Sequence, residues 1–202
     1  RVALQRIVRT SDQFEPAINA ARRFHREEAL RIAVQTLQGR ASASAAGKAY
    51  ADLADACVDA LAEVALAEVA RLHGDPPGAF AIVGLGSFGG HEMTAGSDLD
   101  IMLVFDAADG AQSTGGRALL AGEYFTKLTQ RLVSALSAPT EEGLLYDVDM
   151  KLRPSGSKGP VAVRLSGFAH YYAKEAWTWE LMALTRVRIV AGDMILGAHV
   201  VE

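Results

Sequence analysis

The sequence lacks several features that mark common protein classes. Cys57 is the single cysteine in 202 residues, which excludes an internal disulfide and any metal site made only of cysteines. No apolar run approaches the roughly 20 residues of a membrane span, and no basic stretch followed by an apolar one predicts a signal peptide. We therefore expect a cytoplasmic protein with no membrane partner. The chain does not begin with methionine, so we also expect a piece of a longer protein.

An excess of positive charge is also missing. The chain has 24 acidic and 20 basic residues and a net charge of −4. Proteins that bind nucleic acid backbones usually have a basic face. Here the main cationic cluster is the short run from Lys151 to Lys158. This balance disfavours a nucleic acid partner. Half of the residues are apolar, which is enough for one sizeable core with a helical appendage.

The pattern of apolar residues changes once along the chain. Over Asp12–Gly39 and Lys48–Leu72 it has the helical period, and the run His73–Gly78 stops the second helix. Later segments alternate between strand and helix signals. The expected strands are 80–83, 100–105, 144–153, 161–165 and 187–190; the expected helices are 117–137 and 167–183, the latter capped by Ser166. We predict an α+β fold, with a helical segment (residues 1–76) packed on a catalytic domain (residues 77–202).

Three glycines raise the question of a dinucleotide site. Gly84, Gly86 and Gly89 have G-x-G-x-x-G spacing, and Asp106 follows about 20 residues after the first of them, where such a fold binds a ribose. That fold needs a full helix after the glycines, but the segment up to Ser97 is too short and too polar to form one. The alternative is a phosphate loop in which Gly86 and Ser87 meet a triphosphate through backbone N–H groups and a hydroxyl.

Two acids follow this loop. Asp98 and Asp100 are two residues apart at the entry to a strand, so both carboxylates point to one face. Like charges this close are unfavourable unless a cation shares them, and Mg²⁺ prefers oxygen ligands and completes its shell with substrate phosphates. Taken alone, the pattern also fits a turn in which the aspartates only cap the backbone.

A later run favours the metal site. In the expected strand 144–153 the acids Asp147 and Asp149 share one face with the bases Lys151 and Arg153, and apolar residues take the other. One acid can complete a three-carboxylate site of the kind that two-metal phosphoryl chemistry requires. Lys151 and Arg153 can then neutralise triphosphate oxygens. The alternative is an exposed sheet face with ion pairs.

These motifs resemble the nucleotidyltransferase superfamily, whose fold is that of DNA polymerase β, and more closely the bifunctional glutamine synthetase adenylyltransferase/adenylyl-removing enzymes. The resemblance covers nearly the whole chain. It is carried by the runs GLGSFGGHEMTAGSDLDIMLVF, YFTKLTQRL, LLYDVDMKLRPSGSKGPVAV and EAWTWELMALTRVRIVAGD. It implies a nucleotidyltransferase-type mixed β-sheet with flanking helices, preceded by the helical segment.

The resemblance also implies roles for single residues. Asp98 and Asp100 would bind two Mg²⁺ ions, with Mn²⁺ as an alternative, and Asp149 would complete the ion nearest the attacking oxygen and help to remove its proton. Gly86 and Ser87 would hold the triphosphate of ATP. Family members commonly carry Lys-Leu where this chain has Ser87-Phe88, which leaves more of the phosphate binding to Ser87 and the bases Lys151 and Arg153. Asp147 has no family role and is expected to pair with the neighbouring bases.

The run Asp98-Leu99-Asp100 and the run Glu175–Glu180 look like the adenylylating, C-terminal half of these enzymes. That half transfers AMP from ATP to a tyrosine of glutamine synthetase, releases pyrophosphate and regulates nitrogen assimilation, under control of PII-type signalling proteins in the full-length enzyme. The alternatives are the half that removes AMP by phosphorolysis, a non-catalytic ATP-binding regulatory module, and a nucleic acid nucleotidyltransferase, which the acidic balance disfavours.

Overall fold

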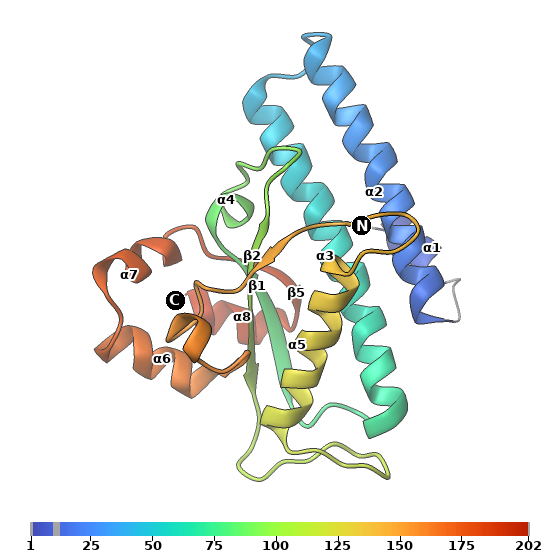
Figure 1. Cartoon of the computed structure of the whole chain (residues 1–202). Helices are drawn as coiled ribbons and strands as arrows, with labels where there is room; N and C mark the ends of the chain where they lie inside the picture. The colour runs from blue at the N-terminus through green and yellow to red at the C-terminus, as the bar shows by residue number, and fades with distance from the viewer. Residues whose placement is uncertain (1, 10–12, 202) are drawn as a thin grey trace.

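Long helices come first along the chain, and a sheet with further helices follows them (Figure 1). The computed structural model describes residues 2–9 and 13–201. Its elements, in order, are α1 (Val2–Arg9), α2 (Phe14–Leu37), α3 (Ala43–His73), β1 (Ala79–Gly84), α4 (Gly86–Gly89), β2 (Leu99–Asp106), α5 (Ala121–Ser137), β3 (Val148–Asp149), a 3-10 turn (Gly156–Lys158), β4 (Ala162–Arg164), α6 (Leu165–Lys174), α7 (Thr178–Leu184), β5 (Arg188–Gly192) and α8 (Met194–Val201). This arrangement confirms the predicted α+β class with a mixed sheet and flanking helices.

Strand β2 is the strand around which the sheet is built. It pairs antiparallel with β1, which pairs antiparallel with β5. On its other side β2 pairs in parallel with β3 at its start and with β4 further along. Neighbouring residues of β2 are buried on opposite faces of the sheet, which explains why its sequence is apolar without alternation.

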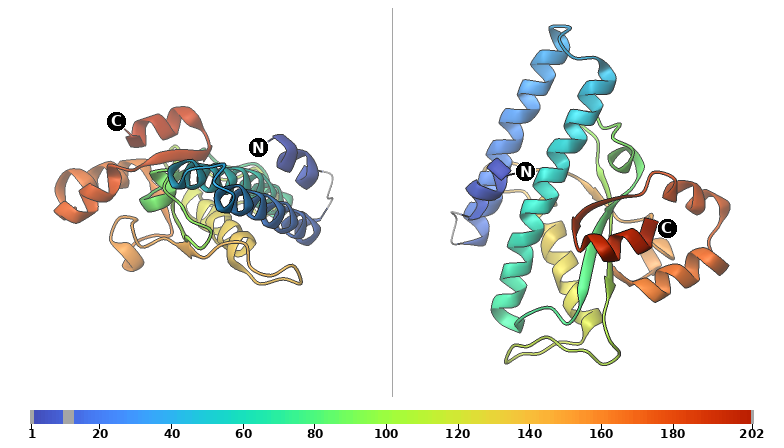
Figure 2. Two further views of the ribbon diagram at one scale, coloured as in Figure 1. Left: turned by 90° about the horizontal axis from the view of Figure 1, so that it is seen from above. Right: turned by 180° about the vertical axis from the view of Figure 1, so that it is seen from behind.

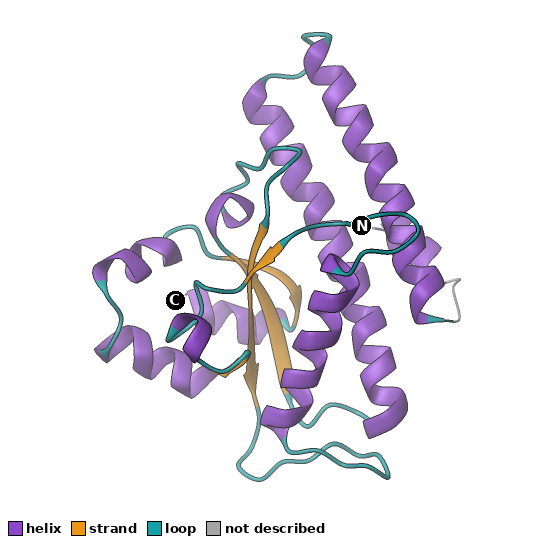
Figure 3. Ribbon diagram, in the orientation of Figure 1, coloured by secondary structure: helices purple, strands orange, loops and turns teal. Residues whose placement is uncertain are grey.

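Helices cover both faces of the sheet (Figure 3). One face carries Ile101, Leu103 and Phe105 of β2 into a core with α3 and α5. The opposite face carries Met102 and Val104 into a smaller core with α6 and α8. Asp100 shares the parity of Met102 and therefore points to the second face, at the end of β2 where the strand begins.

Helices α2 and α3 form an antiparallel pair whose joined ends extend beyond the sheet, and α1 lies beside the start of α2 and the middle of α3 (Figures 1 and 2). The predicted end of α2 at Gly39 is confirmed, since the helix ends at Leu37 and Gly39 takes a φ of 69°. The expected start at Asp12 lies outside the described residues. Helix α3 starts five residues earlier than expected, because the Ser42 hydroxyl accepts a hydrogen bond from the Ala45 amide and caps it.

The apolar faces of α2 and α3 share the main core with α5 and the sheet. We propose residues 1–76 as a helical segment that packs on a catalytic domain of residues 77–202, and this shared core is what supports the packing. Among residues 2–9 and 13–201, no helix is both long and apolar enough to cross a membrane.

The strand expected at 144–153 is wrong in most of its length. Only Val148 and Asp149 pair with the sheet. Leu145 and Tyr146 are neighbours, and both are buried, which strict alternation does not allow. After Asp149 the chain turns away from the sheet into the loop that contains the 3-10 turn.

Two expected helices also have different bounds. The helix expected from residue 117 begins at Ala121, because the preceding residues form a loop closed by a bridge between Gln112 and Leu120. The helix expected over 167–183 is divided into α6 and α7. Arg164 rather than Ser166 is the N-cap of α6, and the Glu180 carboxylate caps the start of α7 by accepting from the Trp177 amide at 2.8 Å.

Protonation of His25 is expected to destabilise the protein at acid pH. The ring of His25 lies edge-on to Tyr146, 4.7 Å between centroids, and burial lowers the pKa of His25 from 6.5 to about 4. The unfolded chain therefore binds a proton near pH 6.5 that the folded chain binds only near pH 4, so the free energy of unfolding falls as the pH drops through this window. Urea unfolding at pH 7 and pH 4.5 should show a loss about 2 kcal/mol larger for the wild type than for His25→Gln. Equal losses in the two proteins would contradict this account.

Candidate active site

Three carboxylates meet where β2 begins. Asp100 and Asp149 are partners in the parallel register of β2 and β3, so their side chains lie next to each other on one face. Asp98 comes just before β2. One carboxylate oxygen from each of these residues lies within 4.8 Å of the other two. The structure thus brings together the three acids that the sequence predicts as metal ligands.

The acids differ in their surroundings. Asp98 is exposed, whereas Asp100 and Asp149 are half-buried. Burial raises the pKa of Asp100, and the negative charges of Asp98 and Asp149 raise it further. The pKa of Asp149 is lowered, first by its hydrogen bond with Lys151, whose ammonium lies 2.7 Å from Asp149 Oδ2. The three carboxylates therefore repel one another, and the exposed Lys151 ammonium balances only part of their charge.

The turn that contains Gly86 lies directly against Asp100. Gly86 has a φ of 56°, and a Cβ added there would lie 2.0 Å from Asp100 Oδ2. The Leu85 amide donates to the Asp100 carbonyl at 2.9 Å, so the turn and the strand are also joined by their backbones. Within the described residues the half-buried Ser87 hydroxyl has no hydrogen-bond partner. Glycine is required here because the chain approaches the carboxylate closely in a left-handed conformation.

Arg188 of β5 holds the other end of this turn. Its guanidinium donates to the carbonyls of Phe88 at 3.0 Å and Gly89 at 3.3 Å, and it lies over the Phe88 ring. The same guanidinium pairs with Asp55 of α3 at 2.6 Å. The Asp55 side chain is 8% exposed and that of Arg188 is 20% exposed. Helix α3 is therefore connected to the Gly86–Gly89 turn through one buried ion pair.

Removal of the Asp55 charge is expected to destabilise the fold. The variant Asp55→Asn leaves the Arg188 guanidinium largely buried without its carboxylate, and we expect the free energy of unfolding to fall by about 3 kcal/mol. The matched control is Asp52→Asn, one turn earlier, which removes an exposed pair with Lys48 and should cost about 0.5 kcal/mol or less. Urea unfolding measures both. Equal losses would mean that the buried Asp55–Arg188 pair stabilises the fold no more than the exposed Asp52–Lys48 pair.

Lys151 and Arg153 do not share a face, contrary to the sequence-based expectation. Lys151 is exposed and lies beside Asp149. Arg153 is only 9% exposed, and its guanidinium donates to the carbonyls of Met150 at 2.6 Å and Pro160 at 3.0 Å. Because Arg153 closes the loop after β3 in this way, its N–H groups are engaged by the backbone. The position of Arg153 thus corrects the expectation that it shares an exposed face with Lys151, and we do not propose it as a phosphate ligand.

Asp147 is exposed, and its side chain has no ion pair in the part of the chain that the structure describes. The expected pairing with the neighbouring bases is therefore wrong. Its backbone has a clear role instead: the Asp147 carbonyl accepts from the Leu99 amide at 2.9 Å, which fixes β3 beside β2.

Sequence reasoning missed two arginines that organise the site. Arg188 supports the glycine turn, and Arg22 of α2 is buried against the end of α5. A signal for Arg22 was present, because it lies next to the apolar positions Ile18 and Ala21 on one helix face, where a charged residue needs acceptors. No comparable pattern marks Arg188.

The mixed sheet, the flanking helices and a glycine turn against three gathered carboxylates define a protein of the nucleotidyltransferase type. Comparison with known sequences narrows this class. The family model described as glutamate-ammonia ligase adenylyltransferase matches residues 1–202, and the chain belongs to this family.

Relatives of the chain carry one common description, bifunctional glutamine synthetase adenylyltransferase/adenylyl-removing enzyme. The chain is 52% identical to the one from Caulobacter vibrioides over 179 residues, which cover 89% of the chain and 18% of the relative. It is 49% identical to that of Rhizobium meliloti over 182 residues, with 89% and 18% coverage. It is 46% identical to that of Xanthobacter autotrophicus over 200 residues, which cover 98% of the chain and 20% of the relative. The chain thus spans about a fifth of the length of these relatives.

Proposed function

We propose that the chain transfers AMP from ATP to a tyrosine of glutamine synthetase and releases pyrophosphate, and that it thereby regulates nitrogen assimilation. The observation that carries this proposal is the gathering of Asp98, Asp100 and Asp149 beside the Gly86 turn. The printed description of the relatives supports the choice of glutamine synthetase as the acceptor. The run Asp98-Leu99-Asp100 favours the adenylylating half of such enzymes.

The donor set fits magnesium. Three carboxylates offer hard oxygen ligands within one small cluster, and their mutual repulsion favours a shared cation. Asp98 and Asp100 would hold two Mg²⁺ or Mn²⁺ ions, and Asp149 would hold one of the two. When bound, such ions supply Lewis-acid stabilisation of the charge on the phosphate oxygens.

The residues of the chain position the reactants. The backbone at Gly86 and the Ser87 hydroxyl bind the triphosphate, and Lys151 turns from Asp149 to a phosphate oxygen. The tyrosine oxygen then forms a bond to the α-phosphorus while the bond to the pyrophosphate oxygen breaks. The tyrosine hydroxyl has a pKa of about 10 and loses its proton as this bond forms. Asp149 is the carboxylate that we assign to accept it, once the Lys151 ammonium has turned away and its side-chain hydrogen bond, the largest cause of the lowered Asp149 pKa, is lost.

The removing reaction is the second candidate, and it is favoured by the second activity in the description of the relatives. It uses the same carboxylates to let phosphate attack AMP-tyrosine and form ADP. Control by a PII-type signalling protein is proposed only through the full-length enzyme.

Two incubations with the intact protein test the proposal. With ATP, Mg²⁺ and unmodified glutamine synthetase, mass spectrometry should show one AMP on a tyrosine of the synthetase. In the second incubation, with adenylylated synthetase and phosphate, the proposal predicts that Asp98→Asn and the wild type release ADP at the same rate. The reason is that these carboxylates would then serve only the addition of AMP and not its removal. Failure of the wild type in the first incubation, with ADP release that depends on Asp98 in the second, would assign the chain to the removing reaction. Failure in both would overturn an AMP-transfer function.

A further inference from the structure

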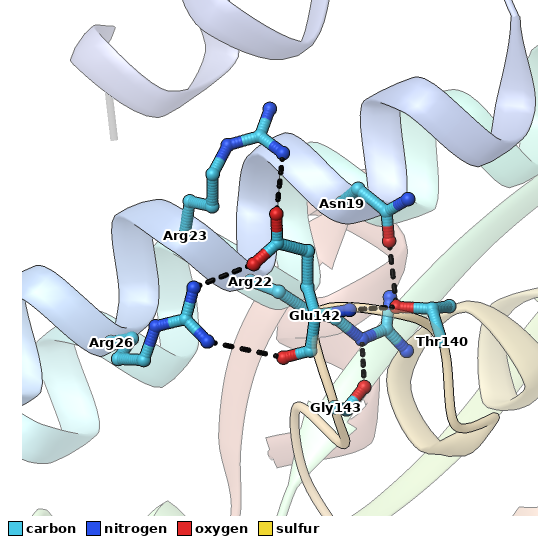
Figure 4. A network of polar contacts seen from close by, with 7 residues as sticks. All are labelled: Asn19, Arg22, Arg23, Arg26, Thr140, Glu142 and Gly143. Atoms are coloured by element: carbon cyan, nitrogen blue, oxygen red, sulfur yellow. Dashed lines mark hydrogen bonds and ion pairs between the residues drawn. The ribbon is translucent and has the colours of Figure 1, made fainter.

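The loop from residue 138 to residue 147 joins α5 to β3 and leads directly to Asp149. Four polar residues of α2 contact this loop, and their spacing of three, four and seven residues places them on one helix face. They are Asn19, Arg22, Arg23 and Arg26, shown with their partners in Figure 4. Helix α2 is far from β3 in sequence but adjacent to this loop in space.

Arg22 is the buried member of the set, with 2% of its surface exposed. Its Nε donates to the Gly143 carbonyl at 2.8 Å, and one terminal nitrogen donates to the carbonyls of Ala138 at 2.5 Å and Ala135 at 3.2 Å. Carbonyls at the end of α5 have no partner inside the helix and carry partial negative charge. The guanidinium therefore joins the end of α5 to the tip of the loop.

The other three members hold the same loop tip from α2. The Glu142 carboxylate lies 2.9 Å from Arg23 and 2.6 Å from Arg26. The Thr140 hydroxyl donates to Asn19 Oδ1 at 2.6 Å (Figure 4). These contacts fix the side-chain edge of the loop, whereas Arg22 fixes its backbone.

The loop is attached again between its tip and the acid. Tyr146 is buried under His25 of α2, and its amide donates to the Leu136 carbonyl at 3.1 Å. The Asp147 carbonyl then accepts from Leu99, and the register of β3 sets Asp149 beside Asp100. From Gly143 to Asp149 the chain is seven residues long, so the loop tip that Arg22 holds and the carboxylate are joined by one short backbone segment.

We propose that Arg22 is a positioning residue that holds Asp149 in place for metal binding through this loop. The proposal deepens the proposed function and rests on it for the role of Asp149. Arg22 does not touch the carboxylates, and its effect is exerted only through the backbone of residues 138–149. A purely structural Arg22 would change stability alone, and a positioning Arg22 also changes metal affinity in the folded protein.

The test uses Arg22→Lys and Arg22→Met in the intact protein, at a temperature where circular dichroism shows each variant folded. Lysine keeps the charge but has all its donors on one nitrogen, whereas Arg22 reaches Gly143 and the end of α5 from two different nitrogens. The milder variant Glu142→Gln weakens the same loop from its exposed side. The matched controls are Val69→Ala, a core truncation in α3, and Glu63→Gln, which breaks the exposed pair between α3 and Arg9 of α1.

The first readout is Mn²⁺ binding, followed by electron paramagnetic resonance of the free ion. We expect about tenfold weaker binding in both Arg22 variants, as is usual when an outer partner of a ligand is lost, a smaller loss in Glu142→Gln, and no change in the controls. The second is amide hydrogen exchange, which should speed up at residues 143–149. The third is AMP transfer, in which kcat should fall about tenfold at subsaturating Mn²⁺ and recover as Mn²⁺ is raised, with KM for ATP unchanged within about twofold.

Wild-type Mn²⁺ affinity in both folded Arg22 variants would overturn the proposal, as would equal weakening in Val69→Ala. If the wild type transfers no AMP at all, the proposed function fails by itself, and the metal-binding and exchange readouts still decide the role of Arg22.

Discussion

The Asp149→Asn variant is expected to lose AMP transfer by about 10³-fold or more while it stays folded. The amide has no negative charge to share with a cation, and under the proposed function the site loses one of its three carboxylate ligands. Stability should change little, because the substitution removes a partly exposed pair with Lys151 and at the same time relieves repulsion from Asp98 and Asp100. Incorporation of AMP into glutamine synthetase and the melting temperature are the two measurements.

The matched control is Asp147→Asn, two residues earlier on the same segment. Asp147 is exposed and has no ion pair among the described residues, so its loss should change activity by less than about threefold. A folded Asp149→Asn protein with wild-type transfer, or an equal loss in the Asp147 control, would contradict the three-carboxylate assignment.

The second large effect is expected for Gly86→Ala. The new methyl group would lie 2.0 Å from Asp100 Oδ2, and the carboxylate must rotate away to accommodate it. A displacement of about 1 Å in a reacting geometry commonly costs about 10²-fold in rate. A left-handed φ at a residue with a Cβ adds a cost in stability of about 1–2 kcal/mol. We therefore expect activity to fall about 100-fold and stability only modestly.

Gly39→Ala separates these two effects. Gly39 also has a left-handed φ, 69°, but a Cβ there meets nothing within 4 Å. This control should show the same loss of stability with full activity. If Gly39→Ala and Gly86→Ala reduce activity equally, contact with Asp100 is not the cause of the effect.

The gathered acids could be predicted from the sequence because their placement depends on short-range geometry. Asp98 and Asp100 are two residues apart, so strand periodicity alone puts them on one face. Asp149 needed one further step, its register with Asp100, and a carboxylate in an apolar strand has few positions where it can remain near water. The dinucleotide alternative is excluded by length, since α4 has four residues and leads to a turn rather than a long helix.

The surroundings of the acids could not be predicted in the same way. Strand alternation predicts an exposed Arg153, but that side chain gains more from three carbonyls of its own loop than from an exposed sheet face. The roles of Arg22 and Arg188 depend on carbonyls that are about 100 residues away in sequence. Local pattern contains no information about such partners, and they become visible only when the helices are packed.

The packing also changes how the helical segment is understood. Asp55 of α3 holds Arg188 under the glycine turn, and Arg22 of α2 holds the loop before Asp149. The two sides of the candidate site are therefore each connected to a different helix of residues 14–73. A displacement of α3 would therefore move the glycine turn, and a displacement of α2 would move the loop before Asp149.

The position of the label transferred from ATP tests the central claim most directly. The intact protein is incubated with glutamine synthetase, Mg²⁺ and ATP labelled either at the α-phosphate or at the γ-phosphate. The account predicts that the α-label becomes bound to the synthetase, that the γ-label leaves in pyrophosphate, and that Asp98→Asn transfers neither. Transfer of the γ-label to the synthetase, or α-label transfer that persists in folded Asp98→Asn, would contradict it.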